Sequence, residues 1–156
     1  MRWTENDIPK TLNDLMSSSN FDEPIMINEC IKHHKESVDL IPSDIELSSI
    51  EMTLVNAMSR EYTMKNCISS IKDKYDYILI DCQPSLGMIT INALACADKV
   101  IIPVQPQFLA AKGMSQLIGT ISKIRKQINP NLKIDGIALT IVDNRTNLTK
   151  NIDKQL

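Results

Sequence analysis

Asp81 is the residue whose type and position give this sequence its clearest chemistry. It follows a short apolar run, Tyr77–Ile80, that is typical of a strand buried on both faces of a parallel sheet. A carboxylate at the C-terminal end of such a strand lies where open α/β sheets bind their ligands. A turn containing Pro84, Ser85 and Gly87 comes next and leads into a helix. Asp81 is therefore a candidate ligand-binding carboxylate.

An Asp directly after a strand also has a simpler explanation. Its side chain can accept hydrogen bonds from nearby backbone N–H groups, so that it serves only as a turn or cap residue. Spacing alone favours this cap for Asp81. The identity of the whole surrounding segment favours the other interpretation.

The segment from residue 75 to residue 105 reads YDYILIDCQPSLGMITINALACADKVIIPVQ. It resembles the Walker B and switch region of the ParA/Soj family of chromosome and plasmid partition ATPases, which are relatives of MinD. Residues 40–47, 55–61 and 141–148 resemble further parts of that family in the same order, and the resemblance extends from about Pro9 onward. Gln83 departs from the family pattern, which usually has a proline there, so we expect a less rigid loop.

The resemblance implies roles for individual residues. The Asp aligned with Asp81 holds Mg²⁺, usually through water, and the turn containing Pro84, Ser85 and Gly87 rearranges with the state of the bound nucleotide. Mg²⁺ keeps several waters and takes few protein carboxylates, which suits a single Asp. ATP and Mg²⁺ are thus the cofactors of an intact family member. Three residues at the same expected edge are candidates to lie near the nucleotide: Gln105, Thr140 and Asn144.

A phosphate-binding loop is missing from the sequence. The family carries a Gly-rich loop with lysines near its start, because closely spaced glycines let successive backbone N–H groups point at one anion. This chain has four glycines, and none is followed by Lys-Ser or Lys-Thr. We therefore expect a fragment that lacks the N-terminal phosphate loop and the C-terminal end. We expect this chain alone to bind no nucleotide and to hydrolyse no ATP.

The family also dimerises on ATP, binds DNA without sequence preference and is stimulated by a centromere-binding partner protein. Lys123, Arg125, Lys126 and Lys133 are candidates for a remnant of the DNA-facing surface. The alternative is that these cations only solvate the outer face of a helix. A net charge of -2 and a pI near 5.7 offer no broad basic stripe, so we expect no DNA binding by the isolated chain.

A homodimer is expected for a separate reason. In nucleotide hydrolases of this class the phosphate-loop strand lies beside the strand that bears the magnesium carboxylate. Without that neighbour, Tyr77–Ile80 is an unpaired apolar edge, and such edges pair with other chains. We expect a second copy or an exchanged segment to cover it.

Bulk composition predicts one globular domain in a reducing compartment. The 156 residues are 43% hydrophobic and 23% charged, which suits a single incomplete ParA-like domain over residues 1–156, with residues 1–8 as a frayed terminus. The four cysteines have no pair at metal-ligand spacing. No leader and no bilayer-length apolar run are apparent, which favours the cytoplasm and no membrane partner.

Apolar patterning predicts alternating strands and helices. Strands are expected at 38–41, 77–80, 99–104 and 134–142, and this order favours a three-layer α/β fold with a mostly parallel sheet and helices on both faces. The fold is P-loop NTPase-like, but incomplete because the phosphate-loop strand and the next strand are missing. The loops after these strands, with Ser43, Asp81, Gln105 and residues 143–147, should converge at one rim.

Helical spacing predicts the remaining elements. Helices are expected at 11–16, after Pro24, at 63–71, at 88–97 and at 110–128, with a final helix cut off at residue 156. Another helix should be capped by Ser48 or Ser49 and should bury Ile50, Leu54, Val55 and Met58. His33 and His34 read as a solvated helix end.

Three classes of function follow. The first is a fragment of a partition ATPase whose activity belongs to a longer protein. The second is a short non-catalytic protein that pairs with a full-length relative and modulates it. The third, an unrelated α/β binding module, is disfavoured by the agreement of several motifs.

Overall fold

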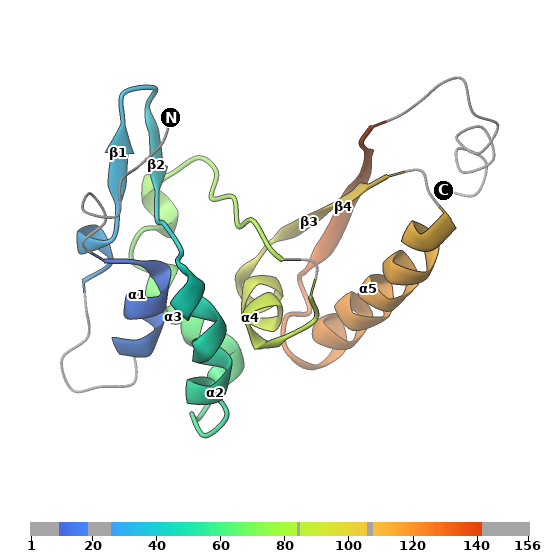
Figure 1. Cartoon of the computed structure of the whole chain (residues 1–156), viewed down its shortest axis with the longest axis horizontal. Coiled ribbons are helices and arrows are strands. Elements are labelled where there is room, and N and C mark those ends of the chain that lie inside the picture. The colour runs from blue at the N-terminus through green and yellow to red at the C-terminus, as the bar shows by residue number, and fades with distance from the viewer. Residues whose placement is uncertain (1–9, 19–25, 84, 106–107, 142–156) are drawn as a thin grey trace. The chain divides into compact units, whose positions relative to one another are not determined.

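The computed structural model describes residues 10–18, 26–83, 85–105 and 108–141 (Figure 1). The chain forms two compact units, Met1–Ala93 and Leu94–Leu156, which we call the first and second units. The α/β class with parallel strand pairing is confirmed. No helix in the described part of the chain is both long enough and apolar enough to cross a bilayer.

The first unit contains α1 (Leu12–Ser18), α2 (Ile50–Leu54), α3 (Thr63–Ile68) and the start of α4 (Met88–Cys96). Short 3₁₀ turns lie between them, at Ile27–Glu29, Ile45–Ser49, Arg60–Tyr62 and Lys72–Lys74. The expected helices at 11–16, 63–71 and 88–97 are confirmed within a few residues. Helix α1 starts at Leu12 because Thr11 and Asp14 form a capping box, in which the Thr11 N–H donates to Asp14 Oδ2 at 2.8 Å.

The core of the first unit is assembled from short elements. Leu15, Ile27, Cys30 and Ile71 form one buried cluster, with Ile41 and other partly buried apolar side chains packed against it. Burial raises the pKa of the Cys30 thiol, because the thiolate is disfavoured away from water. Cys30 is therefore a neutral core side chain, as its apolar surroundings in the sequence indicate.

The cap of the α2 region differs from the prediction. Ser49 occupies the N-cap position of α2 as expected, but its side chain makes no capping hydrogen bond. The capping hydrogen bond is made by Asp44 at the start of the preceding 3₁₀ turn, where its Oδ1 accepts from the Leu47 N–H at 3.1 Å. The helical segment consequently begins earlier, as the 3₁₀ turn Ile45–Ser49. Ile50 and Leu54 are buried as expected, but Val55 and Met58 are exposed, because the helix ends at Leu54 before they could reach the core face.

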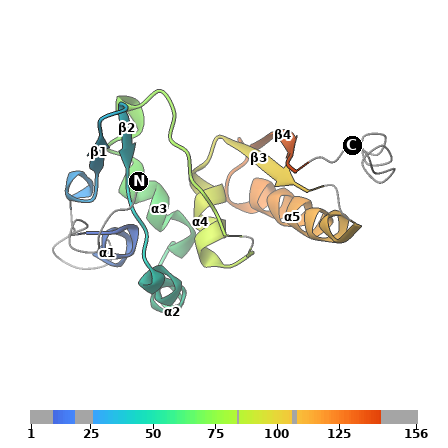
Figure 2. The same ribbon diagram turned by 45° about the horizontal axis from the view of Figure 1, so that its top comes forward.

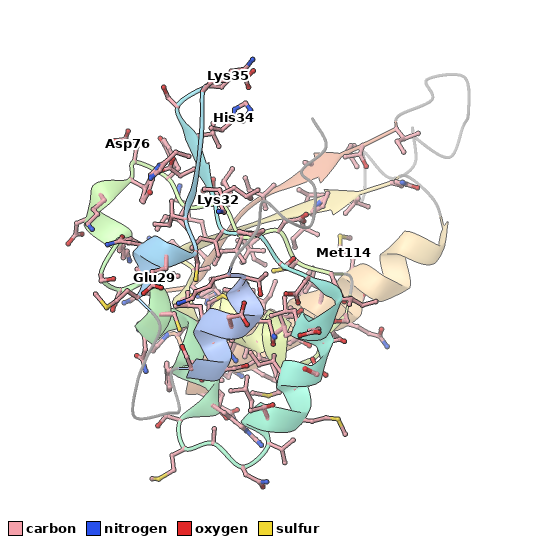
Figure 3. All side chains as sticks on the ribbon, turned by 60° about the vertical axis from the view of Figure 1, so that its left-hand side comes forward. Glu29, Lys32, His34, Lys35, Asp76 and Met114 are labelled. Atoms are coloured by element: carbon pink, nitrogen blue, oxygen red, sulfur yellow. The ribbon has the colours of Figure 1, made fainter. Side chains whose placement is uncertain are left out.

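Residues 32–40 form an antiparallel hairpin, which differs from two of the predictions. Strand β1 (Lys32–His34) pairs with β2 (Val38–Leu40), so the expected parallel pairing of the strand at 38–41 is wrong, and His33 and His34 lie in a strand and not at a helix end. His34 and Lys35 lie at the tip of the hairpin (Figure 3). His33 Nδ1 lies 2.7 Å from Asp39 Oδ1, and Tyr75 donates its hydroxyl to Asp39 Oδ2 at 2.6 Å.

The expected strand at 77–80 does not form. Residues 77–80 have no regular secondary structure, and Tyr77 is 86% exposed and Leu79 90% exposed. Ile78 and Ile80 are less exposed, so burial alternates along the segment as it does in a strand. The physical reason is that a strand requires a neighbouring backbone, and the part of the chain that the structure describes offers none here.

The second unit is a parallel strand pair with one long helix beside it (Figure 2). Strand β3 (Lys99–Val104) pairs with β4 (Lys133–Leu139), and α5 (Phe108–Gln127) forms the crossover between them. The predictions at 99–104 and 110–128 are thus confirmed, and the strand expected at 134–142 forms as β4 but ends at Leu139. The buried residues of this unit include Ile102, Val104, Ile121, Ile124 and Leu132, which alternate on β3 and lie one turn apart on α5.

Candidate functional site

Asp81 lies in the irregular stretch between the 3₁₀ turn Lys72–Lys74 and α4, and it is exposed. The next residue, Cys82, is also exposed, and its thiol points to the carbonyl of Ile80 with an S···O distance of 3.8 Å. Local desolvation, and then the charge of Asp81, raise the pKa of Cys82 above its ordinary value. Cys82 is thus a neutral, weakly nucleophilic thiol at pH 7. The stretch offers two exposed carboxylates to a cation, Asp76 and Asp81, and Asp81 is the one next to the turn that leads into α4.

The turn after Asp81 is tied to the helix that follows it. Ser85 donates its N–H to the carbonyl of Gln83 at 2.7 Å, and the buried Thr90 donates its hydroxyl to the carbonyl of Ser85 at 2.7 Å. The loop therefore closes back onto the first turn of α4.

Gly87 lies in close contact with Glu51 of α2. A methyl group at Gly87 would lie 2.0 Å from Oε1 of Glu51, so the absence of a side chain lets the carboxylate approach. Helix α4 begins at the next residue, Met88, and the N-terminus of a helix attracts a negative charge. Glu51 of α2 thus lies against the residue that precedes α4, a contact that no motif in the sequence indicated.

Asn92 makes the most complete set of hydrogen bonds in this region. It is fully buried on α4, and its Oδ1 accepts from the Met64 N–H at 3.1 Å. Its Nδ2 lies 2.9 Å from the Arg60 carbonyl and 3.0 Å from the Met88 carbonyl, and donates to both. Because buried amide groups are costly when unpaired, these bonds hold α4 against the segment that leads into α3.

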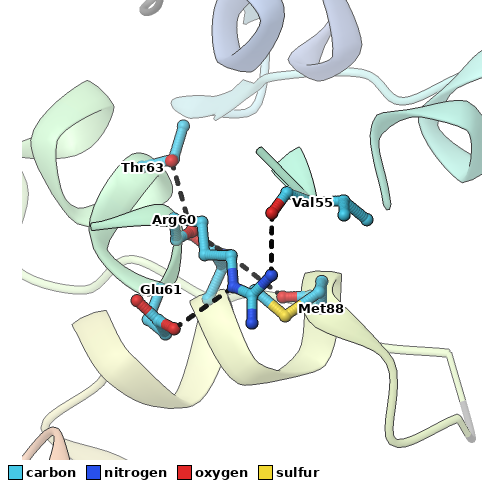
Figure 4. A network of polar contacts seen from close by, with 6 residues as sticks. Val55, Arg60, Glu61, Thr63 and Met88 are labelled. Atoms are coloured by element: carbon cyan, nitrogen blue, oxygen red, sulfur yellow. Dashed lines mark hydrogen bonds and ion pairs between the residues drawn. The ribbon is translucent and has the colours of Figure 1, made fainter. Parts of the chain in front are cut away.

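Arg60 extends the same network (Figure 4). Its Nη1 donates to the Val55 carbonyl at 3.0 Å, and its Nε lies 3.4 Å from Glu61 Oε1. Its carbonyl also accepts a hydrogen bond from the Thr63 hydroxyl at 3.2 Å. The turn between α2 and α3 is therefore fixed by polar contacts at the same place where α4 docks.

The second unit brings two of the predicted nucleotide-proximal residues together. In the parallel register Val104 lies opposite Leu139, so Gln105 and Thr140 follow at the same edge of the strand pair. The Thr140 N–H donates to the Val104 carbonyl at 2.8 Å. Because Asp81 belongs to the first unit, its expected convergence with Gln105 and Thr140 stays a prediction.

Three of the four predicted basic residues lie near the C-terminal end of α5, and the fourth, Lys133, is the exposed first residue of β4. Lys123, Arg125 and Lys126 are exposed, and Arg125 and Lys126 line an open hollow of about 310 Å³ together with Ser122 and Pro130. Cations in the last turn of a helix also stabilise its dipole. The positions of these side chains are consistent both with a DNA-facing surface and with cations that only solvate the outer face of the helix.

Some predicted residues cannot be placed. Pro84, Asn144, residues 1–8, the loop at 143–147 and the expected final helix lie outside the described residues. Among the described residues there is no cluster of three His, Cys, Asp or Glu side chains that could hold a metal ion. A single carboxylate such as Asp81 suits a cation that keeps most of its water, as Mg²⁺ does.

The sequence matches the model of a protein family described as an AAA domain over residues 1–134. The sporulation initiation inhibitor protein Soj of Bacillus subtilis is 48% identical over 113 residues, which are 72% of this chain and 45% of that protein. The chromosome partitioning protein ParA of Myxococcus xanthus is 40% identical over 119 residues, which are 76% of this chain and 42% of that protein.

Structural similarity extends over nearly the whole chain. Cobyrinic acid a,c-diamide synthase from Mycobacterium smegmatis, solved with bound ADP and magnesium, superposes with a TM-score of 0.86 at 29% sequence identity. The match covers 96% of this chain and 59% of that one. This chain thus spans less than two thirds of each of these three proteins.

Proposed function

The chain belongs to the ParA/Soj family of partition ATPases within the AAA domain family, and we propose that it supplies the magnesium carboxylate and the switch loop of a nucleotide site while lacking the phosphate loop. One contrast supports the proposal. The chain has Asp81 and a loop that is hydrogen-bonded to α4, but its sequence contains no Gly-Lys-Ser or Gly-Lys-Thr. The role in DNA segregation then belongs to the longer protein or assembly in which both parts meet.

Magnesium and ATP are the cofactors of this proposal. A structural relative holds ADP and magnesium, and the exposed carboxylate of Asp81 fits a cation that takes few protein ligands. The β- and γ-phosphates require backbone N–H groups and a lysine from a Gly-rich loop. We therefore expect no turnover from this chain alone.

Self-association is the second part of the proposal. The exposed segment Tyr77–Ile80 alternates in burial, and the structure gives none of its backbone groups a backbone partner among the described residues. In an antiparallel pairing centred on Ile78, Tyr77 lies opposite the partner's Leu79, so the central pairs are apolar. A second copy is therefore a fitting neighbour for this edge.

DNA and a centromere-binding protein are the remaining partners that the family offers. Lys123, Arg125 and Lys126 are the candidate DNA-facing residues, because they are exposed cations near the C-terminal end of α5. The small negative net charge leads us to expect no DNA binding by the isolated chain. The alternative function, a non-catalytic partner that modulates a full-length relative, uses the same exposed segment as its contact.

Isothermal titration of the purified chain with ATP and magnesium tests the proposal. We expect no saturable heat from the wild type or from Asp81→Ala. Saturable binding that is lost in Asp81→Ala would contradict the proposal that this chain alone binds no nucleotide. It would indicate that a nucleotide site forms without the phosphate loop. Addition of a polypeptide that carries the Gly-rich loop of a relative should restore binding in the wild type and not in Asp81→Ala.

A further inference from the structure

Residues 76–83, which we call the Asp81 stretch, make few contacts of their own. They have no regular secondary structure, and Figure 1 shows them as a single length of coil that runs from the side of the hairpin to α4. Among the described residues, the hydrogen bonds of this stretch are local, from the Cys82 thiol to the Ile80 carbonyl and from the Ser85 N–H to the Gln83 carbonyl. The position of the stretch therefore depends on what holds its two ends.

Tyr75 holds the N-terminal end. It follows the 3₁₀ turn Lys72–Lys74 and has an extended backbone, with φ at −126° and ψ at 139°, so the chain becomes extended at this residue. Its ring packs against the buried cluster that contains Leu15 and Ile71. Its hydroxyl donates to Asp39 Oδ2 at 2.6 Å, across 36 positions of the sequence. Tyr75 is thus fixed both by the core and by the hairpin.

The acceptor of this hydrogen bond is itself held in place. Asp39 lies opposite His33 in the register of the hairpin, and its second oxygen, Oδ1, lies 2.7 Å from His33 Nδ1. The Asp39 side chain is only 24% exposed. Because each carboxylate oxygen has a partner, the group cannot rotate without loss of a contact, and hydrogen bonds to a carboxylate are stronger than those between neutral groups.

The C-terminal end of the stretch is held by α4, through the hydrogen bond from the buried Thr90 hydroxyl to the Ser85 carbonyl at 2.7 Å. Asp81 lies six positions after Tyr75 and four before Ser85. An extended chain advances by about 3.3 Å per residue, so release of either end lets Asp81 move over several ångströms. With both ends fixed, its range is much smaller.

We propose that Tyr75 and Asp39 are positioning residues for Asp81, because the hairpin fixes the start of the stretch that carries this carboxylate. A stretch that is already ordered loses less conformational entropy when it pairs with another strand or meets a bound ligand. The effect on Asp81 as a magnesium carboxylate rests on the proposed function. The ordering of the stretch by the hairpin does not.

Backbone order parameters from NMR relaxation test the ordering directly. All samples carry Leu79→Lys, which prevents two copies from pairing through this segment. Tyr75→Phe keeps the ring and removes the hydroxyl, and Asp39→Ala removes the acceptor. In both variants we expect the order parameters of residues 77–81 to fall below about 0.6, the range of flexible backbone. Asp39→Asn retains an acceptor and should resemble the parent.

The controls separate this role from a loss of fold. Tyr77→Phe removes an exposed hydroxyl from the same stretch and should leave the order parameters unchanged, as should those of α1 in every variant. The proposal would be overturned by order parameters at 77–81 that do not change in Tyr75→Phe and Asp39→Ala, or that are already below about 0.6 in the parent. A decrease that extends to α1 in both variants would assign Tyr75 and Asp39 to stability alone and would also overturn it.

A second measurement connects the ordering to Asp81. The chain without Leu79→Lys is titrated with ATP and magnesium in the presence of the polypeptide that carries a relative's Gly-rich loop. We expect Tyr75→Phe to weaken binding by roughly threefold or more, and Tyr77→Phe to have no effect. Binding that is equal in the wild type and Tyr75→Phe would refute the positioning of Asp81 and leave the proposed function intact. No binding even in the wild type, with order parameters that respond as expected, would refute the proposed function and support the ordering by the hairpin.

Discussion

The side-chain oxygen of Asn92 accepts a hydrogen bond from the backbone N–H of Met64 at 3.1 Å, across 28 positions of the sequence. Met64 lies in the first turn of α3, where backbone N–H groups have no partner within the helix. Asn92 thus hydrogen-bonds a backbone N–H group that has no partner within α3, and it does so from α4, the helix that follows the Asp81 loop. The position of α4 and the start of α3 are consequently linked.

Replacement of Asn92 by leucine should lower the free energy of unfolding by about 2–4 kcal/mol. The leucine would leave the Met64 N–H and the Arg60 carbonyl buried without this partner. Urea denaturation followed by circular dichroism measures the loss. Asn66→Leu on α3 is the matched control, because Asn66 is exposed, and it should cost less than about 0.5 kcal/mol. Equal losses in the two variants would contradict the role of the buried amide.

Asn129 should be a second polar anchor, in the second unit. Its Nδ2 donates to the carbonyl of Leu94 in the last turn of α4, at 3.0 Å, and to the carbonyl of Ala97 directly after the helix, at 2.8 Å. We expect Asn129→Ala to cost about 1–2 kcal/mol, because the end of the helix loses both donors. Thermal unfolding checks this, with Asn131→Ala, an exposed neighbour in the same turn, as control. A change in the control as large as that in Asn129→Ala would indicate an effect of the turn backbone instead.

The elements that the sequence predicted best are those with strong periodicity of their own. The spacing of Ile121 and Ile124 and the apolar run at 99–104 were enough to place α5 and β3. The hairpin at 32–40 was missed because its turn carries neither Asn-Gly nor Asp-Gly, and Ser37 adopts the left-handed conformation instead, with φ at 59°. The segment at 77–80 reads as a strand, but pairing depends on a neighbour that local sequence does not encode.

The residues of the candidate site also differ in whether the sequence alone identifies them. Asp81 and Gly87 are recognisable from their motif, whereas Glu51 and Asn92 act through contacts between segments far apart in sequence. One signal for Asn92 was present. An amide in the middle of the apolar helix ITINALAC is either exposed or fully bonded, and its neighbours Ile91 and Ala93 favour burial. Propensity alone does not identify its partners.

The hairpin should make stability depend on pH through Asp39. The Tyr75 hydroxyl, and then His33, lower the pKa of Asp39 below its ordinary value of 3.8. The Asp39 carboxylate therefore contributes fully to stability above pH 3.8, and this contribution is lost as the pH falls through the lower pKa of the folded state. Asp39 in turn raises the pKa of Tyr75 above 10.0. That contribution is complete below 10.0 and is lost as pH rises through the raised pKa.

The test is the difference in unfolding free energy between the wild type and Tyr75→Phe, measured from acid to alkaline pH. We expect a constant difference between about pH 5 and pH 9, with a decrease on both sides. Tyr77→Phe is the control, since the Tyr77 ring is exposed, and it should show no such decrease. A difference that stays constant into the acid range would mean that Tyr75 does not stabilise the Asp39 carboxylate.

The exposed segment at 77–80 should decide the oligomeric state. Leu79→Lys places a charge at the centre of the proposed edge, where Leu79 is 90% exposed, so it should shift a dimer to a monomer without loss of fold. Analytical ultracentrifugation over a wide concentration range measures this, with Met26→Lys, an exposed methionine elsewhere in the first unit, as the control that stays dimeric. A wild type that is monomeric at every concentration would refute the pairing of two copies, and the segment would then require a strand from a longer relative.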